Sequence, residues 1–167
     1  MEFRKAIEND IIEIIKIIKQ AQEYFKSNEI DQWQNNYPNL DTIKNDIKNN
    51  YGHVLVENSR IVGTVSVSFD GEKTYEEIYG GQWLSNNKYA VIHRRAIDNE
   101  YKRGGLSSVI IKHLEELCLD NDIHSIKVDT HIKNIPMQKL LKKNNYQYCG
   151  IIYLDDKSER VAFEKLF

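Results

Sequence analysis

A short turn, Lys102-Arg103-Gly104-Gly105-Leu106-Ser107-Ser108, combines the residue types that bind phosphate. Apolar residues recur with helical spacing from Leu106 onward, so the turn stands at the start of a predicted helix. The first backbone N–H groups of a helix lack partners within it and carry a partial positive charge. Glycine and serine let an anion approach them, while Lys102 and Arg103 add two positive charges. We therefore predict an anion site that suits a diphosphate better than a carboxylate.

The turn alone also admits a purely structural interpretation, because glycines at turns relieve backbone strain. Other phosphate motifs are absent from the sequence: there is no G-x-x-x-x-G-K-[ST] loop, and no G-x-G-x-x-G with an acidic residue about 20 positions on. A nucleoside triphosphatase and a dinucleotide-dependent enzyme are therefore not supported.

The second candidate for chemistry is His93, in the middle of a predicted buried strand from Tyr89 to Ile97. An imidazole has a reference pKa near 6.5 and is suited to accepting a proton at neutral pH, directly or through water. Alternation along the strand predicts His93 and Arg95 on one face and Arg94 on the other. The alternative is a buried polar cluster of these three residues, satisfied by Glu76, Glu77 or Asp129.

Aromatic and acidic side chains gather in two segments outside the predicted helices and strands. Trp33 and Tyr37 lie between the first two helices, and the connection 70–88 holds Glu77 and Trp83 with Tyr75 and Tyr79. Long connections in compact domains are often functional, and an aromatic, acidic pocket attracts amines. Trp33, Tyr37, Glu77 and Trp83 are therefore candidates for contact with an amine substrate, with ordinary core packing of the aromatics as the alternative.

The elements that must position these residues follow from hydrophobic periodicity. A helix is predicted from Asp10 to Phe25, with Asp10 and Glu13 spaced as a capping box, and a short second helix capped by Asp41. A hairpin is expected around Asn58-Ser59. The remaining predictions are the strands 89–97, 125–131, 146–154 and 160–167, the helix that opens at Leu106, and a helix over 134–143.

Composition bounds the class of protein. The chain has 167 residues and a formal charge of -2 with a pI near 6.2, so we expect a single domain, 1–167, and no nucleic-acid partner. No stretch approaches the roughly 18 apolar residues of a membrane span, and the N-terminus lacks a signal peptide's apolar core. We expect a cytoplasmic protein with no membrane partner. Cys118 and Cys149 lack metal-ligand spacing and are predicted core thiols, so no metal is expected.

The runs 89–108 and 130–150 together resemble the GCN5-related N-acetyltransferase (GNAT) superfamily. Its cofactor signature is Gln or Arg, two residues, Gly, one residue, then Gly or Ala. The signature falls here on Lys102, Gly105 and Ser107, of which Gly105 matches literally. The resemblance implies an α/β (α+β) fold with a mixed, mostly antiparallel sheet of about 6–7 strands, flanked by about four helices, and a V-shaped splay between the strands near 89–97 and 125–131.

The resemblance also implies acetyl-CoA as co-substrate. Its pyrophosphate would contact the turn at Lys102, Arg103, Gly104, Gly105, Leu106, Ser107 and Ser108, and its pantetheine arm would contact the backbone of Arg95, Ala96 and Ile97 and the side chain of Asn134. A simple helix cap is the alternative for Asn134. His93 corresponds to a histidine on the same strand of serotonin N-acetyltransferase, which supports a general base. The family's tyrosine acid, seven residues after the asparagine, is replaced by Leu141, which leaves Tyr146, Tyr148 or water.

These expectations describe an acyltransferase that moves an acetyl group from acetyl-CoA to a primary amine of a small molecule or peptide, by direct attack in a ternary complex, as a monomer or homodimer. Two alternatives remain: a non-catalytic domain that binds or senses acetyl-CoA, and a structural domain without cofactor. The fold does not identify the acceptor.

Overall fold

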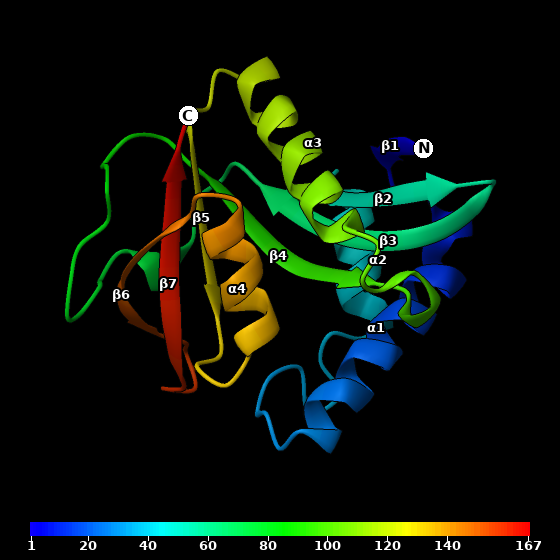
Figure 1. The fold of residues 1–167 in the computed structure, drawn as a ribbon, viewed down its shortest axis with the longest axis horizontal. Helices are drawn as coiled ribbons and strands as arrows, with labels where there is room; N and C mark the ends of the chain where they lie inside the picture. Colours follow the sequence, from blue (N-terminus) through cyan, green and yellow to red (C-terminus); the bar gives the residue numbers. More distant parts are fainter. The chain divides into compact units, whose positions relative to one another are not determined.

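The computed structural model describes all residues from Met1 to Phe167. Seven strands form one mixed sheet in the order β1-β2-β3-β4-β5-β7-β6, with four α-helices, which confirms the fold class implied by the resemblance (Figure 1). The chain divides into two compact units, Met1–Val67 with His93–His113, and Ser68–Ile92 with Leu114–Phe167. None of the helices has the length and apolar character needed to cross a membrane.

The first unit is built on three antiparallel strands. Strand β1 (Glu2–Lys5) pairs with β2 (Gly52–Glu57), which pairs with β3 (Arg60–Ser68). The predicted hairpin between β2 and β3 is confirmed, because Asn58 and Ser59 adopt φ values of 49° and 62°. Two successive positive φ values define the turn whose twist matches that of the flanking strands.

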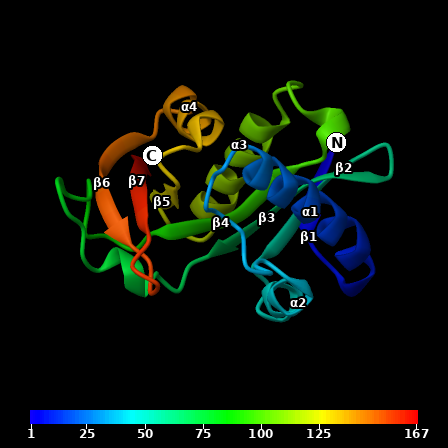
Figure 2. The same ribbon diagram turned by 90° about the horizontal axis from the view of Figure 1, so that it is seen from below.

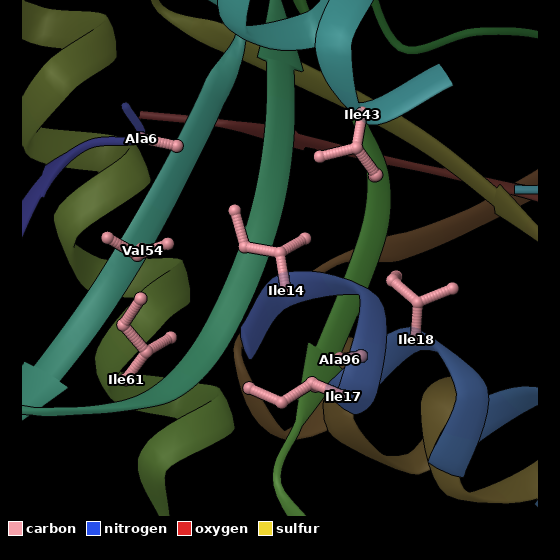
Figure 3. Packing of buried hydrophobic residues seen from close by; sticks show 8 residues of the cluster. All are labelled: Ala6, Ile14, Ile17, Ile18, Ile43, Val54, Ile61 and Ala96. Carbon is pink, nitrogen blue, oxygen red and sulfur yellow. The ribbon is translucent and has the colours of Figure 1, made fainter. Parts of the chain in front are cut away.

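Two helices cover one face of these strands. Eight buried residues from α1 (Ile11–Ser27), α2 (Leu40–Lys48), the strands and the first loop make up this core (Figure 3), namely Ala6, Ile14, Ile17, Ile18, Ile43, Val54, Ile61 and Ala96. The beginning of α3 (Leu106–Asp120) lies on the other face (Figures 1 and 3). Burying an isoleucine side chain fully stabilises the folded state by about 1.5–3 kcal/mol relative to leaving it exposed. Ala96 belongs to the same cluster, so the end of β4 (Ala90–Ile97) packs on this face.

Both helix starts differ from the sequence-based expectation. The capping box of Asp10 and Glu13 is wrong, because the Asp10 side chain makes no cap to α1. Its carboxylate instead accepts the backbone N–H of Ile7 at 2.8 Å and pairs with Arg4 at 2.7 Å. Asn39, and not Asp41, caps α2, since the Asn39 Oδ1 accepts the N–H of Thr42 at 3.0 Å. The polar residue just before a helix satisfies its first N–H groups better than one inside it.

The second unit contains the remaining strands and α4 (Ile135–Lys143). Strand β7 (Glu159–Leu166) pairs antiparallel with both β5 (Ser125–Thr130) and β6 (Gln147–Tyr153). The start of β4 joins β5 in parallel, with Ala90 opposite Ile126 and Val91 opposite Lys127. Helix α4 covers one face of β5, β7 and β6, and the connection 70–88 covers the other (Figures 1 and 2).

The connection 70–88 is fixed to the sheet by its backbone. Tyr79 exchanges two backbone hydrogen bonds with Ile151, at 2.9 and 2.8 Å. Gly81 approaches β6 so closely that a Cβ there would lie 2.0 Å from the carbonyl oxygen of Cys149. Tyr75 packs with Val91, Ile152 and Ala162 in the core of this unit. Tyr75 therefore packs on the sheet, while Tyr79 and Gly81 lie against the backbone of its edge strand β6.

Candidate active site

Strand β4 is kinked where the sequence places its polar residues. Arg94 adopts φ = 51°, in the left-handed region, where residues other than glycine are uncommon. This backbone interrupts the extended geometry on which simple alternation depends. The predicted distribution of His93, Arg94 and Arg95 over two faces therefore does not follow from their spacing. His93 is half-buried and immediately precedes the kink.

The Arg94 guanidinium is held by partners that the sequence did not suggest. Its Nε donates to Asp46 Oδ2 at 2.7 Å, and its Nη2 donates to Asp46 Oδ1 at 2.5 Å. Nη2 also donates to the hydroxyl of Ser66 at 3.2 Å, and Nη1 donates to the hydroxyl of Tyr37 at 2.9 Å. Burial is the largest single influence and lowers the pKa of Arg94, but the hydrogen bonds and charge interactions with Asp46 and Tyr37 together outweigh it, so the pKa is raised.

Two of the acidic residues considered as partners for the cluster of His93, Arg94 and Arg95 contact other residues and do not pair with Arg94. Glu77 is exposed and accepts a hydrogen bond from the Tyr79 hydroxyl at 2.8 Å. Asp129 accepts one from the buried Tyr75 hydroxyl at 2.6 Å. Asp46 takes their place at Arg94 because α2 packs beside the kink, a proximity that spacing along the chain does not reveal.

The glycine turn is exposed and opens α3 as predicted. Arg103 and Gly105 both have positive φ values, 72° and 77°. The carbonyl of Gly105 accepts the N–H groups of Ser108 and Val109 at 3.0 and 3.3 Å, which begins the helical hydrogen bonding. Leu106 is buried and anchors the helix, whereas residues 102–105 face solvent. The backbone N–H groups before Ser108 therefore belong to the part of a helix that has no internal acceptors.

Arg95 contributes a positive charge to this turn that the sequence did not predict. Its Nη1 donates to the Ser107 hydroxyl at 2.7 Å. Burial lowers its pKa to about 10, which still leaves the guanidinium charged at neutral pH. Burial and the nearby Arg95 charge also lower the pKa of Lys102. The two cations repel each other, so a bound anion would stabilise both.

Several other candidate residues serve as structural contacts in their own unit. Asn134 caps α4, because its Oδ1 accepts the N–H of Met137 at 3.3 Å and its Nδ2 donates to Thr130 Oγ1 at 3.0 Å. This arrangement confirms the cap; a contact with cofactor stays a prediction. Leu141 is fully buried, and the buried Tyr146 hydroxyl has no hydrogen-bond partner. Burial raises the pKa of Tyr146 well above its usual value, so this phenol is a poor proton donor.

The aromatic candidates differ in their surroundings. Trp33 packs edge-on against Phe25, with 5.5 Å between ring centroids, and joins the core of the first unit. Trp83 lies against Tyr75, and its ring face is covered by the Lys127 ammonium at 4.5 Å from the centroid. Tyr37, by contrast, remains 45% exposed. Tyr37 is therefore the aromatic candidate best placed to meet a substrate.

The buried cysteines are core thiols, as predicted. Cys118 and Cys149 form no disulfide, and burial raises their pKa values to about 12 and about 11. Nowhere do three His, Cys, Asp or Glu side chains gather as a metal site would require.

Comparison with known proteins assigns the family. The sequence profile described as "Acetyltransferase (GNAT) family" matches residues 14–146. A GNAT-family acetyltransferase from Streptococcus agalactiae 2603 is 34% identical, with a TM-score of 0.92, over 99% of this chain and 95% of that one. The chain belongs to the GNAT acetyltransferase family. The GNAT profile spans the kink of β4, the glycine turn and Asn134, and it ends just before β6.

More distant GNAT structures share the fold. A GNAT-family acetyltransferase from Listeria monocytogenes 4b F2365 is 15% identical, with a TM-score of 0.76, over 99% of this chain and 94% of that one. A ribosomal-protein-alanine N-acetyltransferase from Brucella melitensis is 14% identical, with a TM-score of 0.71, over the full length of both chains. No curated protein matches the sequence. Membership of the GNAT family therefore establishes an acetyltransferase family and fold and leaves the acceptor open.

Proposed function

We propose that this GNAT protein is an acetyl-CoA-dependent N-acetyltransferase, a single cytoplasmic domain over residues 1–167 that acetylates a primary amine of a small molecule or peptide. The observation that carries the proposal is the exposed glycine turn at the start of α3, with the Arg95 guanidinium bonded to Ser107 within it. Family membership makes coenzyme A the natural diphosphate for this anion site.

The residues of the turn fit a pyrophosphate. No atom lies within 4 Å of the position that a Cβ on Gly105 would occupy, so the backbone there is open to a ligand. Lys102 and Arg95 supply charge, and the N–H groups of residues 104–107 supply donors. Acetyl-CoA, when bound, supplies an acetyl group activated as a thioester. The backbone of Arg95, Ala96 and Ile97, together with Asn134, completes the proposed cofactor contacts.

His93 is the proposed general base. It lies next to the kink and close in sequence to the strand residues proposed to meet the cofactor, and an imidazole takes a proton effectively near neutral pH. Backbone N–H groups in the segment 95–97 would stabilise negative charge developing on the acetyl oxygen. No side-chain acid is assigned to the thiolate, because a thiol of reference pKa near 8.5 leaves without one and the family's tyrosine is replaced by the buried Leu141.

Tyr37 heads the proposed acceptor contacts, with Trp33, Glu77 and Trp83 retained from the sequence-based prediction. Tyr37 and Glu77 offer an aromatic ring and a carboxylate to an amine, and both are exposed. The substrate named for the Brucella relative is a ribosomal-protein alanine, and that relative shares only the fold. A small-molecule amine and a peptide amine are therefore both tested.

A second candidate function is a non-catalytic domain that senses acetyl-CoA. The full burial of Leu141 where the family places its tyrosine acid favours this alternative. Both functions involve binding of coenzyme A, so only turnover of acetyl-CoA with an amine distinguishes them.

The deciding experiment measures thiol release from acetyl-CoA with a panel of amines and peptides, alongside thermal unfolding with and without coenzyme A. Amine-dependent thiol release with a rise in the melting temperature supports the acetyltransferase. A rise in melting temperature without turnover on any amine supports the sensing domain. Absence of any thermal shift at high coenzyme A excess contradicts both.

A further inference from the structure

The left-handed kink at Arg94 must be held in place by contacts with other residues, because an arginine does not favour a positive φ by itself. A non-glycine residue in this region is strained, and such residues persist only when their surroundings fix them. The neighbouring residues Arg95, Ala96 and Ile97 are those whose backbone is proposed to meet the acetyl thioester. Whatever fixes Arg94 therefore also fixes the direction of these peptide groups.

The guanidinium of Arg94 is joined to three separate parts of the first unit. Asp46 is buried and lies on α2, Ser66 lies on β3, and Tyr37 lies in the segment before α2. These bonds use the Nε hydrogen, both Nη2 hydrogens and one of the two on Nη1. Almost all of the guanidinium N–H groups thus donate within the protein, and the side chain links these three segments.

The pairing with Asp46 is the strongest of these contacts. It is bidentate, with both bonds at 2.7 Å or less, and both side chains are largely buried, with exposed fractions of 14% for Arg94 and 6% for Asp46. Bidentate pairs between arginine and a carboxylate fix orientation as well as distance. Lysine would keep the charge but would lose this geometry.

We propose that Arg94 is a positioning residue for acetyl transfer, clamped by Asp46 so that it holds the kink of β4 and fixes Tyr37 beside it. This inference rests on the proposed acetyltransferase function. The clamp acts on the reaction through the backbone of residues 95–97, and it acts on the acceptor through Tyr37. It does not bind the pyrophosphate, whose proposed ligands are on the glycine turn.

Steady-state kinetics of Asp46→Asn test the clamp, with Asp41→Asn on the exposed side of the same helix as the matched control. We expect kcat to fall at least about tenfold in Asp46→Asn, because the variant leaves a buried guanidinium poorly paired. The loss of coenzyme A affinity should be smaller, because the glycine turn keeps its proposed contacts with the pyrophosphate. Asp41→Asn should match the wild type. Equal losses of kcat and coenzyme A affinity in Asp46→Asn, or an unchanged kcat, would overturn the inference.

The comparison of Arg94→Ala with Arg94→Gly isolates the kink. Both variants lose every side-chain bond, but glycine adopts positive φ without strain whereas alanine does not. We expect Arg94→Gly to retain a kcat about fivefold higher than Arg94→Ala. If Arg94→Ala does not fold, Tyr37→Phe removes one bond of the clamp at an exposed side chain and should raise the KM for the amine several-fold at nearly constant kcat. Equal kcat values for the two Arg94 variants, or an unchanged KM in Tyr37→Phe, contradict the proposal.

Amide hydrogen exchange separates a failed clamp from a failed function. Asp46→Asn should exchange at least about tenfold faster than Asp41→Asn at residues 95–97, whether or not an acceptor amine is known. If wild-type protein acetylates no amine, the proposed function fails, and the exchange measurement still decides whether the clamp exists. Unchanged exchange in Asp46→Asn would show that Asp46 does not hold the kink.

Discussion

Arg95 Nη1 lies 2.7 Å from the hydroxyl of Ser107, a hydrogen bond that ties the end of β4 to the first turn of α3. The two residues are 12 positions apart, and the exposed glycine turn lies between them. A residue proposed to present its backbone to the cofactor therefore also places its charge at the anion site. The strand and the turn are coupled by this one side chain.

Replacement of Arg95 should weaken binding of coenzyme A. Arg95→Met removes a buried charge at the site, and a hydrogen bond to a charged group contributes about 1.5–3 kcal/mol, so we expect a loss of affinity of about 10- to 100-fold in calorimetric titrations. Lys112→Met, at an exposed position further along α3, is the control and should leave the affinity nearly unchanged. An equal loss of affinity in the two variants would contradict this role of Arg95.

Gly105→Ala should damage both the fold and the cofactor site. At φ = 77° backbone strain should lower the free energy of unfolding of the alanine variant by about 1–2 kcal/mol, although no neighbouring atom obstructs its Cβ. Urea unfolding should show that loss, and the affinity for coenzyme A should fall because the methyl group occupies space open to phosphate. A Cβ added at Gly104 would lie 3.4 Å from the Tyr101 carbonyl oxygen, an ordinary van der Waals contact, so Gly104→Ala should leave stability nearly unchanged. Similar losses in both variants would argue against a special role for Gly105.

Replacement of His93 tests the proposed base. His93→Ala should lower kcat by about 10²-fold or more, because general base catalysis contributes about that much, while coenzyme A binding stays nearly intact. Thiol release and calorimetry on the same preparation provide both values. A parallel loss of kcat, binding and melting temperature would indicate that His93 has a structural role.

His53 should make stability depend on pH. Burial lowers its pKa, and its ring is stacked 5.3 Å from that of Phe3. The unfolded chain takes up a proton near pH 6.5 whereas the folded protein resists it, so the free energy of unfolding should fall as pH drops below about 6.5. Urea unfolding between pH 7.5 and 5 measures this slope. His53→Phe should flatten the slope and the exposed His124→Gln should not; an unchanged slope in His53→Phe would rule out this cause.

Glu164 should be important for fixing the connection 70–88. Its fully buried carboxylate accepts the Leu84 N–H at 2.6 Å and the hydroxyls of Ser85 and Ser125 at 3.0 and 2.7 Å. Glu164→Gln replaces one acceptor oxygen by a donor and leaves a partner unsatisfied, which costs about 1–3 kcal/mol. Urea unfolding should show this loss, with faster exchange of the Leu84 amide. Unchanged exchange there would mean that other contacts hold the segment.

The sequence predicted those elements whose causes are local. The hairpin at Asn58-Ser59 and the helix opened by the glycine turn follow from the residues of the turns themselves. The Asp10 capping box failed because Arg4 and Ile7 satisfy that carboxylate, and nothing in the helix pattern identifies those partners.

The candidate site was predicted in outline, and its long-range contacts were not. The turn at residues 102–108 lies where its pattern indicated. The kink at Arg94 carries no local signal, because an arginine in a strand gives no sign of a positive φ. Its partner Asp46 is 48 positions away, brought close by the packing of α2. The positions of Arg94 and Arg95 in the middle of an apolar strand did indicate that their guanidinium groups must have buried hydrogen-bond partners.

The close approach of Gly81 to β6 also determines how this protein tolerates mutation. Every larger residue there would place its Cβ within 2.0 Å of the Cys149 carbonyl oxygen, a distance that no rearrangement of side chains relieves. A library that randomises residues 80–82 should recover almost any residue at the exposed Gln82 but glycine alone at position 81. At Gly80, where φ is 66°, it should recover mainly glycine, asparagine and aspartate. Two adjacent glycines therefore limit variation in the connection 70–88, Gly81 through the neighbouring backbone and Gly80 through its own φ.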